Sequence, residues 1–254
     1  MKFKIKNTIK IISCILFLLC VPIIVNVVIH NLSAQTFAGG SKKMPIYCVD
    51  TKEKRVAISF DSCSDPDYTG EILDILDKYN VKADFFLVGY YVDKHPDMVK
   101  EIQKRGHEIG NHSNKHPDMA YSSKEKIVGD ISACDTKIMN VTGEMPKLFR
   151  FPSGSYNDNA IAAAESTNHL CIQWDVDSID WKEKGLDIEY NRIVTKTKPG
   201  SILLFHNNAK YTPKNLPRII EKLKSEGYTF VKISDLLYKD NYKLDISGKQ
   251  IKNY

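Results

Sequence analysis

Residues 55–89, RVAISFDSCSDPDYTGEILDILDKYNVKADFFLVG, decide the fold class. Val56–Phe60 is an apolar run typical of a buried strand, and Ala83–Val88 is a second one. Between them, Tyr68–Tyr79 repeats apolar residues at helical spacing. A strand, a helix and a strand in this order predict two parallel strands joined by a right-handed crossover.

The same alternation continues to residue 232. The sequence predicts further helices and strands, which are helices at Asp97–Arg105, Ser123–Val141, Asn157–Glu165, Asp187–Thr197 and Leu216–Ser225, and strands at Glu108–Asn111, Leu148–Arg150, His169–Trp174, Ser201–Phe205 and Tyr228–Lys232. This order favours an α/β fold with a mostly parallel sheet, either open or closed into a barrel. In both arrangements the active site lies at the carboxyl ends of the strands.

The N-terminal segment, residues 1–30, predicts a membrane-spanning or signal helix. Four lysines precede 19 uncharged residues, Ile11–Ile29, which is about the length that crosses a bilayer. Basic residues before the span place the rest of the chain outside the cytoplasmic membrane. The length of the run favours an uncleaved anchor, whereas the small residues that follow it suit a cleaved signal peptide and secretion. We expect a linker over 31–54, a folded domain over 55–238 and a polar tail over 239–254.

Charge and cysteine content exclude some classes of function. The formal net charge is +5, but four of the lysines precede the apolar run, and the remainder is nearly neutral. We therefore expect no nucleic-acid partner. The six cysteines include no CxxC spacing and indicate neither a disulfide framework nor a zinc knuckle. The sequence does not indicate an oligomeric state.

Polar and charged residues follow successive predicted strands. Asp61 follows the first strand, His112 the third, Arg150 ends the fourth, Asp177 follows the fifth and His206 the sixth. Each alone has an ordinary structural explanation, such as a cap, a surface ion pair or a buried histidine. Because parallel strands deliver their carboxyl ends to one face, the five together predict an active site there.

His112 and His116 form an HxxxH pair. Such a pair alone is often a chance spacing of two surface histidines. On one helical turn, however, the two imidazole rings would point the same way and could share a metal ion.

Five segments in order resemble the motifs of the NodB-homology polysaccharide deacetylases, carbohydrate esterase family 4. They are ISFD at 58–61, HSNKH at 112–116, RFPSG at 150–154, DSIDW at 177–181 and LLFH at 203–206. The resemblance covers residues 55–238 and implies a distorted (β/α) barrel with fewer than eight strands. The segment KYNVKA at 78–83 is similar to the sporulation-type branch, which suggests peptidoglycan as the substrate class.

The resemblance implies a role for each matched polar residue. Asp61 would be the general base and His206 the general acid, while His112 and His116 would bind a divalent metal. Zinc is the favoured ion, with cobalt or manganese as alternatives. The ion would polarise the acetyl carbonyl, because an amide is a poor electrophile.

Five neighbouring residues receive supporting roles from the same resemblance. Asp177 would tune His206, and Arg150 would hold Asp61 ionised and oriented. The backbone N–H of Ser153 would donate to the tetrahedral oxyanion. Trp181 and Leu204 would form the pocket for the acetyl methyl group, although ordinary core packing explains them equally well.

Ser62 departs from the family pattern. Most members have a second aspartate at this position, which completes an Asp-His-His metal site. Cys63, Asp65 and Asp67 lie in the same loop and could replace it, or Asp61 could itself join the ion. Cys63 suits zinc because a thiolate supplies negative charge, while its alternative role is that of a small buried apolar residue.

These features predict metal-dependent hydrolysis of N-acetyl groups on a cell-wall glycan, most specifically peptidoglycan amino sugars. The rival from another class is a catalytically silent wall-binding module, which Ser62 favours. An O-deacetylase acting on another acetylated glycan would use the same residues. An unrelated amidase or phosphatase is not indicated, because the chain has neither a nucleophile elbow nor a phosphate-binding glycine loop.

Overall fold

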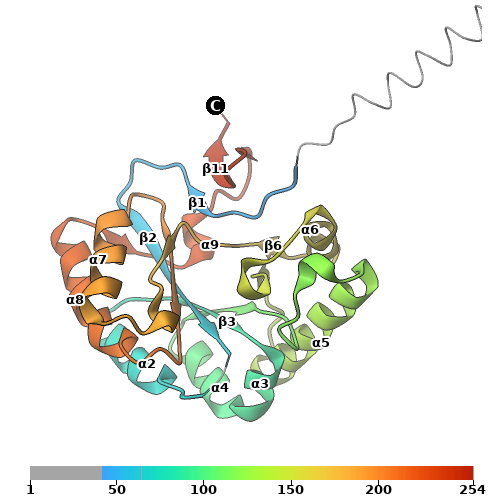
Figure 1. Ribbon diagram of the computed structural model, residues 1–254, viewed down its shortest axis with the longest axis horizontal. Coiled ribbons are helices and arrows are strands. Elements are labelled where there is room, and N and C mark those ends of the chain that lie inside the picture. The colour runs from blue at the N-terminus through green and yellow to red at the C-terminus, as the bar shows by residue number, and fades with distance from the viewer. Residues whose placement is uncertain (1–41, 64, 254) are drawn as a thin grey trace, which may run out of the picture. The chain divides into compact units, whose positions relative to one another are not determined.

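The computed structural model describes residues 42–63 and 65–253 (Figure 1). The predicted membrane anchor or signal segment, residues 1–30, lies outside these ranges. Within them, no helix combines the length and the apolar character that a membrane span requires.

Strands and helices alternate as expected. The strands are β1 (Cys48–Val49), β2 (Arg55–Ser62), β3 (Asp84–Leu87), β4 (Glu108–Asn111), β5 (Leu148–Phe149), β6 (Leu170–Cys171), β7 (Val176–Asp177), β8 (Ile202–His206), β9 (Thr229–Phe230), β10 (Tyr242–Leu244) and β11 (Lys249–Lys252). The α-helices are α2 (Thr69–Lys78), α3 (Gly89–Lys94), α4 (Pro96–Lys104), α5 (Lys124–Thr142), α6 (Asp158–Glu165), α7 (Leu186–Lys196), α8 (Thr212–Ser225) and α9 (Ile233–Leu236). Short 3-10 helices are η1 (Met119–Tyr121), η2 (Pro152–Gly154) and η3 (Asp180–Lys182).

The main sheet is parallel and curls into an open half-barrel. Its strands run in the order β6-β5-β4-β3-β2-β8-β7, and β9 pairs with β2 beside this path. The helices lie around the outside of the sheet (Figure 1). The predicted α/β class is therefore confirmed, and the seven strands of the path agree with the expectation of fewer than eight.

The central strand β2 is buried along nearly its whole length, as its unbroken apolar run predicts. Phe60 on β2 stacks on Phe85 of β3, with ring centroids 5.0 Å apart, and lies 5.8 Å from the ring of Phe205 on β8. In the parallel register, Asp61 pairs with His206 across β2 and β8. The sheet itself therefore brings two of the predicted catalytic residues side by side.

Residues 43–54 of the predicted linker and residues 239–253 of the predicted tail belong to the folded unit. The main-chain N–H of Ile46 donates to Cys171 at the β6 edge, and the N–H of Val49 donates to Gly200 just before β8, at 2.8 and 2.9 Å. β1 also pairs with β11, and β11 with β10, in a separate three-stranded sheet. The sequence did not indicate β1, β10 and β11, because short strands with few apolar residues give little periodic signal.

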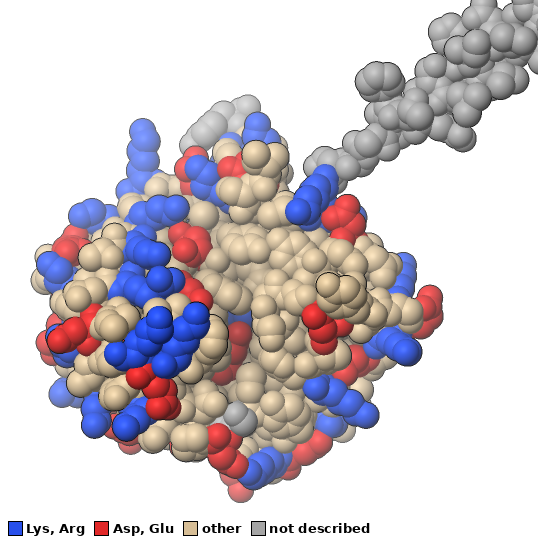
Figure 2. Space-filling model, in the orientation of Figure 1, with Lys and Arg blue, Asp and Glu red and all other residues tan. Residues whose placement is uncertain are grey.

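Three further α-helices and strands were not predicted. α3 and α9 have only six and four residues, too few for helical periodicity to show, and β7 has two. The predicted strand His169–Trp174 is reduced to the two residues of β6. Figure 2 shows that the drawn face is hollowed near its middle, with basic side chains gathered over α7 and α8 on one side.

Gly200 offers a test of how the segment before β2 is held. Its φ is 84°, and a Cβ there would lie 1.8 Å from the carbonyl oxygen of Val49. Gly200→Ala should therefore lower the free energy of unfolding, measured by urea denaturation, by about 2–3 kcal/mol. Gly129→Ala on α5 is the matched control: a Cβ there meets nothing within 4 Å, so stability should stay equal or rise by up to about 1 kcal/mol. Equal stability of the two variants would contradict this account of the segment.

Candidate active site

The carboxyl ends of the strands surround a cleft of about 500 Å³. Nine of the residues singled out in the sequence line it, together with Trp174 and Asn208: Asp61, Cys63, His112, His116, Ser153, Asp177, Trp181, Leu204 and His206. Arg150 lies directly beneath and is fully buried. The structure therefore brings these residues together, as the strand-end argument predicts.

Arg150 connects the base candidate to the rest of the sheet. Its guanidinium donates to Asp61 Oδ1 at 2.8 Å and to the Ser59 hydroxyl at 2.9 Å. The guanidinium carbon also lies 3.9 Å from the centroid of the Phe86 ring. These contacts compensate the burial of the cation and fix the Asp61 carboxylate in one orientation.

Asp61 is buried yet remains acidic. Burial alone would raise its pKa, but the His112 ring and the Arg150 guanidinium lower the pKa below its ordinary value. Burial also lowers the pKa of His112 to about 4, so that ring is neutral at neutral pH. Arg150 is then the lasting positive charge that keeps Asp61 ionised.

The tautomer of His112 is set by the backbone. His112 Nδ1 lies 2.8 Å from the carbonyl oxygen of Arg150, which can only accept, so Nδ1 carries the hydrogen. The unprotonated Nε2 then faces the cleft, 3.4 Å from Asp61 Oδ2. Two acceptor atoms turned toward each other favour a cation between or beside them.

The HxxxH pair lies on a loop after β4, not on a helical turn as expected. Ser113 and His116 have φ values of 73° and 55°, which helical backbone does not allow. The Asn111 side chain holds the loop by accepting from the Ser113 N–H at 2.7 Å. The rings of His112 and His116 nevertheless come together, with centroids 5.0 Å apart.

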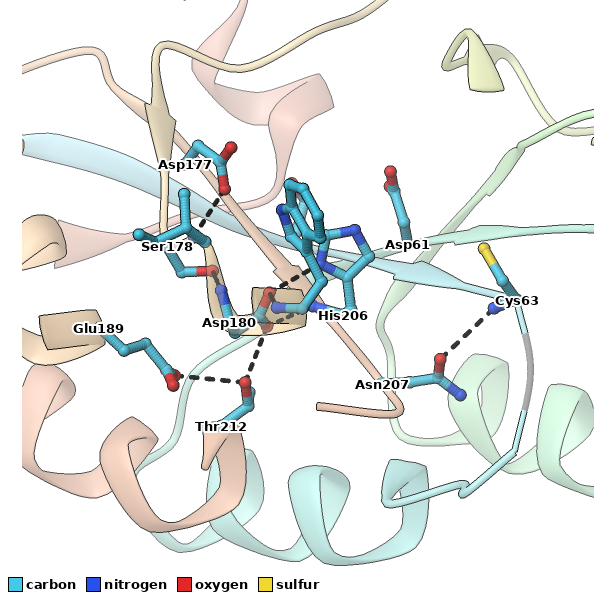
Figure 3. Close-up of polar contacts among 12 residues, drawn as sticks. Asp61, Cys63, Asp177, Ser178, Asp180, Glu189, His206, Asn207 and Thr212 are labelled. Atoms are coloured by element: carbon cyan, nitrogen blue, oxygen red, sulfur yellow. Dashed lines mark hydrogen bonds and ion pairs between the residues drawn. The ribbon is translucent and has the colours of Figure 1, made fainter. Parts of the chain in front are cut away.

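Cys63 supplies a third donor atom beside the two histidines. Its sulfur and one nitrogen each of His112 and His116 all lie within 4.8 Å of one another. Asn207, directly after β8, accepts from the Cys63 N–H at 3.4 Å (Figure 3). A thiolate and two imidazoles form a donor set that suits zinc, so the residues present fit a divalent ion.

The two aspartates of the same loop interact with other residues. Asp65, the other candidate for a third ligand, forms an ion pair with Lys94, and its Oδ1 lies 3.7 Å from His95 Nε2. Asp67 accepts from Tyr91 at 2.9 Å and from Asn207 at 2.9 Å. The structure therefore does not bring Asp65 or Asp67 to the histidines.

Ser62 does not take the place of the missing carboxylate as a charged group. Its side chain is buried, and its hydroxyl has no hydrogen-bond partner among the described residues. The nearest charge-bearing substitute is the thiol of Cys63, the next residue. In the protein without metal, burial and the Asp61 charge raise the pKa of that thiol, so metal binding has to displace its proton.

The carboxylate that contacts His206 belongs to Asp180, not to Asp177 as expected. His206 Nδ1 lies 2.7 Å from Asp180 Oδ1, and the His206 N–H donates to Oδ2 at 2.7 Å (Figure 3). The Asp177 carboxylate instead accepts from the Ile179 N–H at 2.7 Å. Asp177 lines the cleft and acts on His206 only through its charge. The sequence offered Asp180, immediately before Trp181, but spacing alone does not separate the two carboxylates.

His206 has a raised pKa. Burial alone would lower it, but the hydrogen bond to Asp180 and the charge of that carboxylate raise the pKa above its ordinary value. His206 therefore retains its proton to higher pH than a free histidine. With Nδ1 bound to Asp180, its Nε2 is the atom left to deliver a proton to the cleft.

Ser153, Trp181 and Leu204, which have predicted supporting roles, line the cleft at different depths. Ser153 has a φ of 53° within η2, and Trp181 is 56% exposed while Leu204 is 2% exposed. Trp181 thus forms part of the rim and Leu204 part of the floor. Because Trp181 is more than half exposed, core packing alone explains it less well than a role in the cleft does.

Comparison with known proteins identifies the family. A polysaccharide deacetylase family model matches residues 49–172. The chain is 38% identical over 194 residues to a peptidoglycan-N-acetylglucosamine deacetylase of Bacillus cereus, which covers 74% of this chain and 91% of the relative. The chain belongs to the polysaccharide deacetylase family. The family predicted from the motifs is thereby confirmed, together with its class of hydrolases that act on carbon–nitrogen bonds.

Two other relatives of this polysaccharide deacetylase mark the range of the family. Peptidoglycan-N-acetylmuramic acid deacetylase PdaA of Bacillus subtilis is 31% identical over 202 residues, with 78% of this chain and 77% of PdaA covered. A crystal structure of a family pseudoenzyme from Bacillus anthracis superposes with a TM-score of 0.74 at 32% identity, covering 83% of this chain and 73% of that one. The fold is thus shared by active and inactive members.

The assignment of Asp180 as the partner of His206 can be tested directly. Asp180→Asn removes the charge and one acceptor, so the pKa of His206 should fall by about one unit or more. Asp177→Asn, the matched control, should lower it much less, because Asp177 makes no hydrogen bond to the ring. NMR titration of the histidine ring protons would measure both. A larger shift in Asp177→Asn would contradict the assignment.

Proposed function

We propose that this chain hydrolyses N-acetyl groups of peptidoglycan amino sugars, using a divalent metal, outside the cytoplasmic membrane. The observation that carries the proposal is the pairing of Asp61 with His206 across β2 and β8, with opposite pKa shifts. An ionised base and an acid that keeps its proton to higher pH than a free histidine then face one cleft, as amide hydrolysis requires.

The roles of the residues follow from their surroundings. A divalent ion held by His112, His116 and Cys63 would polarise the acetyl carbonyl and promote ionisation of the attacking water. Asp61, held by Arg150, accepts the proton of that water. His206 donates a proton from Nε2 to the departing amine, which would otherwise be a poor leaving group.

Three residues of the cleft lining would surround the acyl group. The backbone N–H of Ser153 would donate to the oxyanion. Leu204 and Trp181 would contact the acetyl methyl group, since they are the apolar side chains of the lining closest in sequence to the acid and its partner. The named relatives act on N-acetylglucosamine or N-acetylmuramic acid of peptidoglycan, which supports peptidoglycan over xylan and a role in cell-wall or spore-wall remodelling.

A catalytically silent glycan-binding module is the second candidate. Ser62 favours it, and so does the likeness to the Bacillus anthracis pseudoenzyme. Under this alternative the cleft binds sugar but holds no competent metal. The apolar run at residues 11–29 would anchor either protein to the membrane.

Acetate release decides between the two. Full-length protein in detergent should be stripped of metal and assayed on purified peptidoglycan, then resupplied with zinc, cobalt or manganese. The proposal predicts metal-dependent acetate, and a loss of at least about 100-fold in Asp61→Asn without loss of bound metal. Binding of peptidoglycan without acetate, under every metal, would establish the silent module instead.

The third metal ligand can be tested without activity. Cobalt bound by a thiolate gives a sulfur-to-metal charge-transfer absorption in the near ultraviolet, which should be present in the parent chain and absent in Cys63→Ser. Zinc affinity in that variant should fall by about 10-fold or more. Cys171→Ser is the matched control, because Cys171 is buried on β6 away from the cleft and should keep both properties. An unchanged absorption in Cys63→Ser would exclude Cys63 as a ligand.

A further inference from the structure

A buried threonine lies between two carboxyl groups behind His206. Thr212 Oγ1 is 2.8 Å from Asp180 Oδ2 and 3.2 Å from Glu189 Oε1 (Figure 3). All three side chains are almost completely shielded from solvent, with 0%, 2% and 3% exposure for Thr212, Asp180 and Glu189. The chain of contacts starts on α7, crosses the first turn of α8 and ends at the acid candidate on β8.

The hydrogens of this chain can be assigned from the donors present. Asp180 accepts from the His206 ring, from the His206 N–H and from the Trp181 N–H at 2.7, 2.7 and 2.8 Å. The Thr212 hydroxyl has one hydrogen, and its shorter contact gives that hydrogen to Asp180. The contact between Glu189 and Thr212 is then a hydrogen bond only when Glu189 itself carries a proton.

Glu189 is suited to carry that proton near neutral pH. Glu189 Oε2 has no hydrogen-bond partner among the described residues. No lysine or arginine among the described residues forms an ion pair with the Glu189 carboxyl group. Burial and the charge of Asp180 raise the pKa of Glu189 to about 7, while the polar contacts of Glu189 with Asn215 and Thr212 act in the opposite direction.

The charged groups around the chain are accounted for on each neighbouring element. On α8, Arg218 reaches Asn215 Oδ1 and Asp187 rather than Glu189. On α7, Arg192 donates to the Asp177 carbonyl. Asp180 is thus the charge that acts on Glu189 from η3, and His206 lies beyond it.

We propose that Glu189 is a positioning residue that acts through Thr212 on Asp180 and thereby sets the proton affinity of His206. When Glu189 is protonated, it donates to Thr212, and Thr212 donates to Asp180. When Glu189 ionises, it takes the Thr212 hydrogen, and Asp180 loses one donor. Asp180 then binds the His206 ring more strongly, so His206 keeps its proton to higher pH. The inference rests on the proposed function only in treating His206 as the acid.

Glu189→Gln keeps the hydrogen bonds in the arrangement of protonated Glu189, because an amide N–H can donate to Thr212 at every pH. The pKa of His206 should then fall by about half a unit to one unit, the size expected for losing one charge several ångströms away in a protein interior. Histidine-selective NMR titration of the full-length protein in detergent measures this, with His206→Gln to assign the signal. Asp187→Asn, an exposed charge loss on the same helix, is the matched control and should leave the pKa unchanged.

The route through Thr212 has its own test. In a Thr212→Val background, Glu189→Gln should shift the pKa of His206 by much less than in the parent chain. In a Thr212→Ser background, which keeps the hydroxyl, the full shift should return. Thr212→Ala replaces the valine variant if that variant does not fold. An equal shift with and without the hydroxyl would overturn the route, and no shift in Glu189→Gln alone would overturn the proposal.

The kinetic readout separates this inference from the proposed function. The alkaline limb of kcat/KM for acetate release should move to lower pH in Glu189→Gln, with kcat at acid pH and bound metal unchanged. A merely structural role would lower kcat without moving the limb, and would overturn the proposal. If the parent chain released no acetate but Glu189→Gln still lowered the pKa of His206, the proposed function would be wrong. The role of Glu189 as a positioning residue for His206 would remain supported.

Discussion

The buried ion pair between Arg150 and Asp61 is the constraint on which the rest of the site depends. A fully buried guanidinium is costly unless its donors are compensated. Here Asp61, Ser59 and the Phe86 ring compensate its two terminal nitrogens and its face, while Nε has no partner among the described residues. The same residue uses its carbonyl to set the tautomer of His112. One residue at the end of β5 thus orients the base candidate and a metal-ligand candidate together. Loss of the cation would leave Asp61 buried and unpaired, at a cost of about 3–5 kcal/mol.

Charge balance explains why Cys63 matters in a chain that has Ser62. Asp61 and Arg150 neutralise each other, and His112 is neutral, so these residues alone give a divalent ion little net negative charge. A thiolate at Cys63 would add one such charge close to both imidazoles. Asn207 helps to place the thiolate, because its side-chain amide accepts from the Cys63 N–H and donates to Asp67 in the same loop. The residue after His206 therefore shapes the metal side of the cleft.

Much of the fold could be predicted because its main elements carry strong periodic patterns. β2, β4 and α5 were found within a residue or two, whereas α3 and β7 are too short for a period to appear. The site was found by residue type at strand ends, but local geometry was not. Spacing does not reveal that HxxxH lies on a loop, since only the positive φ of Ser113 and His116 decides that. Nor does spacing choose between Asp177 and Asp180, because tertiary hydrogen bonds make the choice.

Asp61 and Asp180 are both buried, but they have different partners. The partner decides the chemical role of each carboxylate. Asp61 is paired with an arginine, a permanent cation, so its negative charge is retained and available to accept a proton. Asp180 is paired with a histidine, whose charge is conditional, so the same negative charge raises a neighbour's pKa instead. β2 and β8 hold the two pairs in adjacent register. Because each carboxylate is buried against its own partner, the two environments shift the pKa values of Asp61 and His206 in opposite directions, and a base and an acid can coexist at facing positions of one sheet.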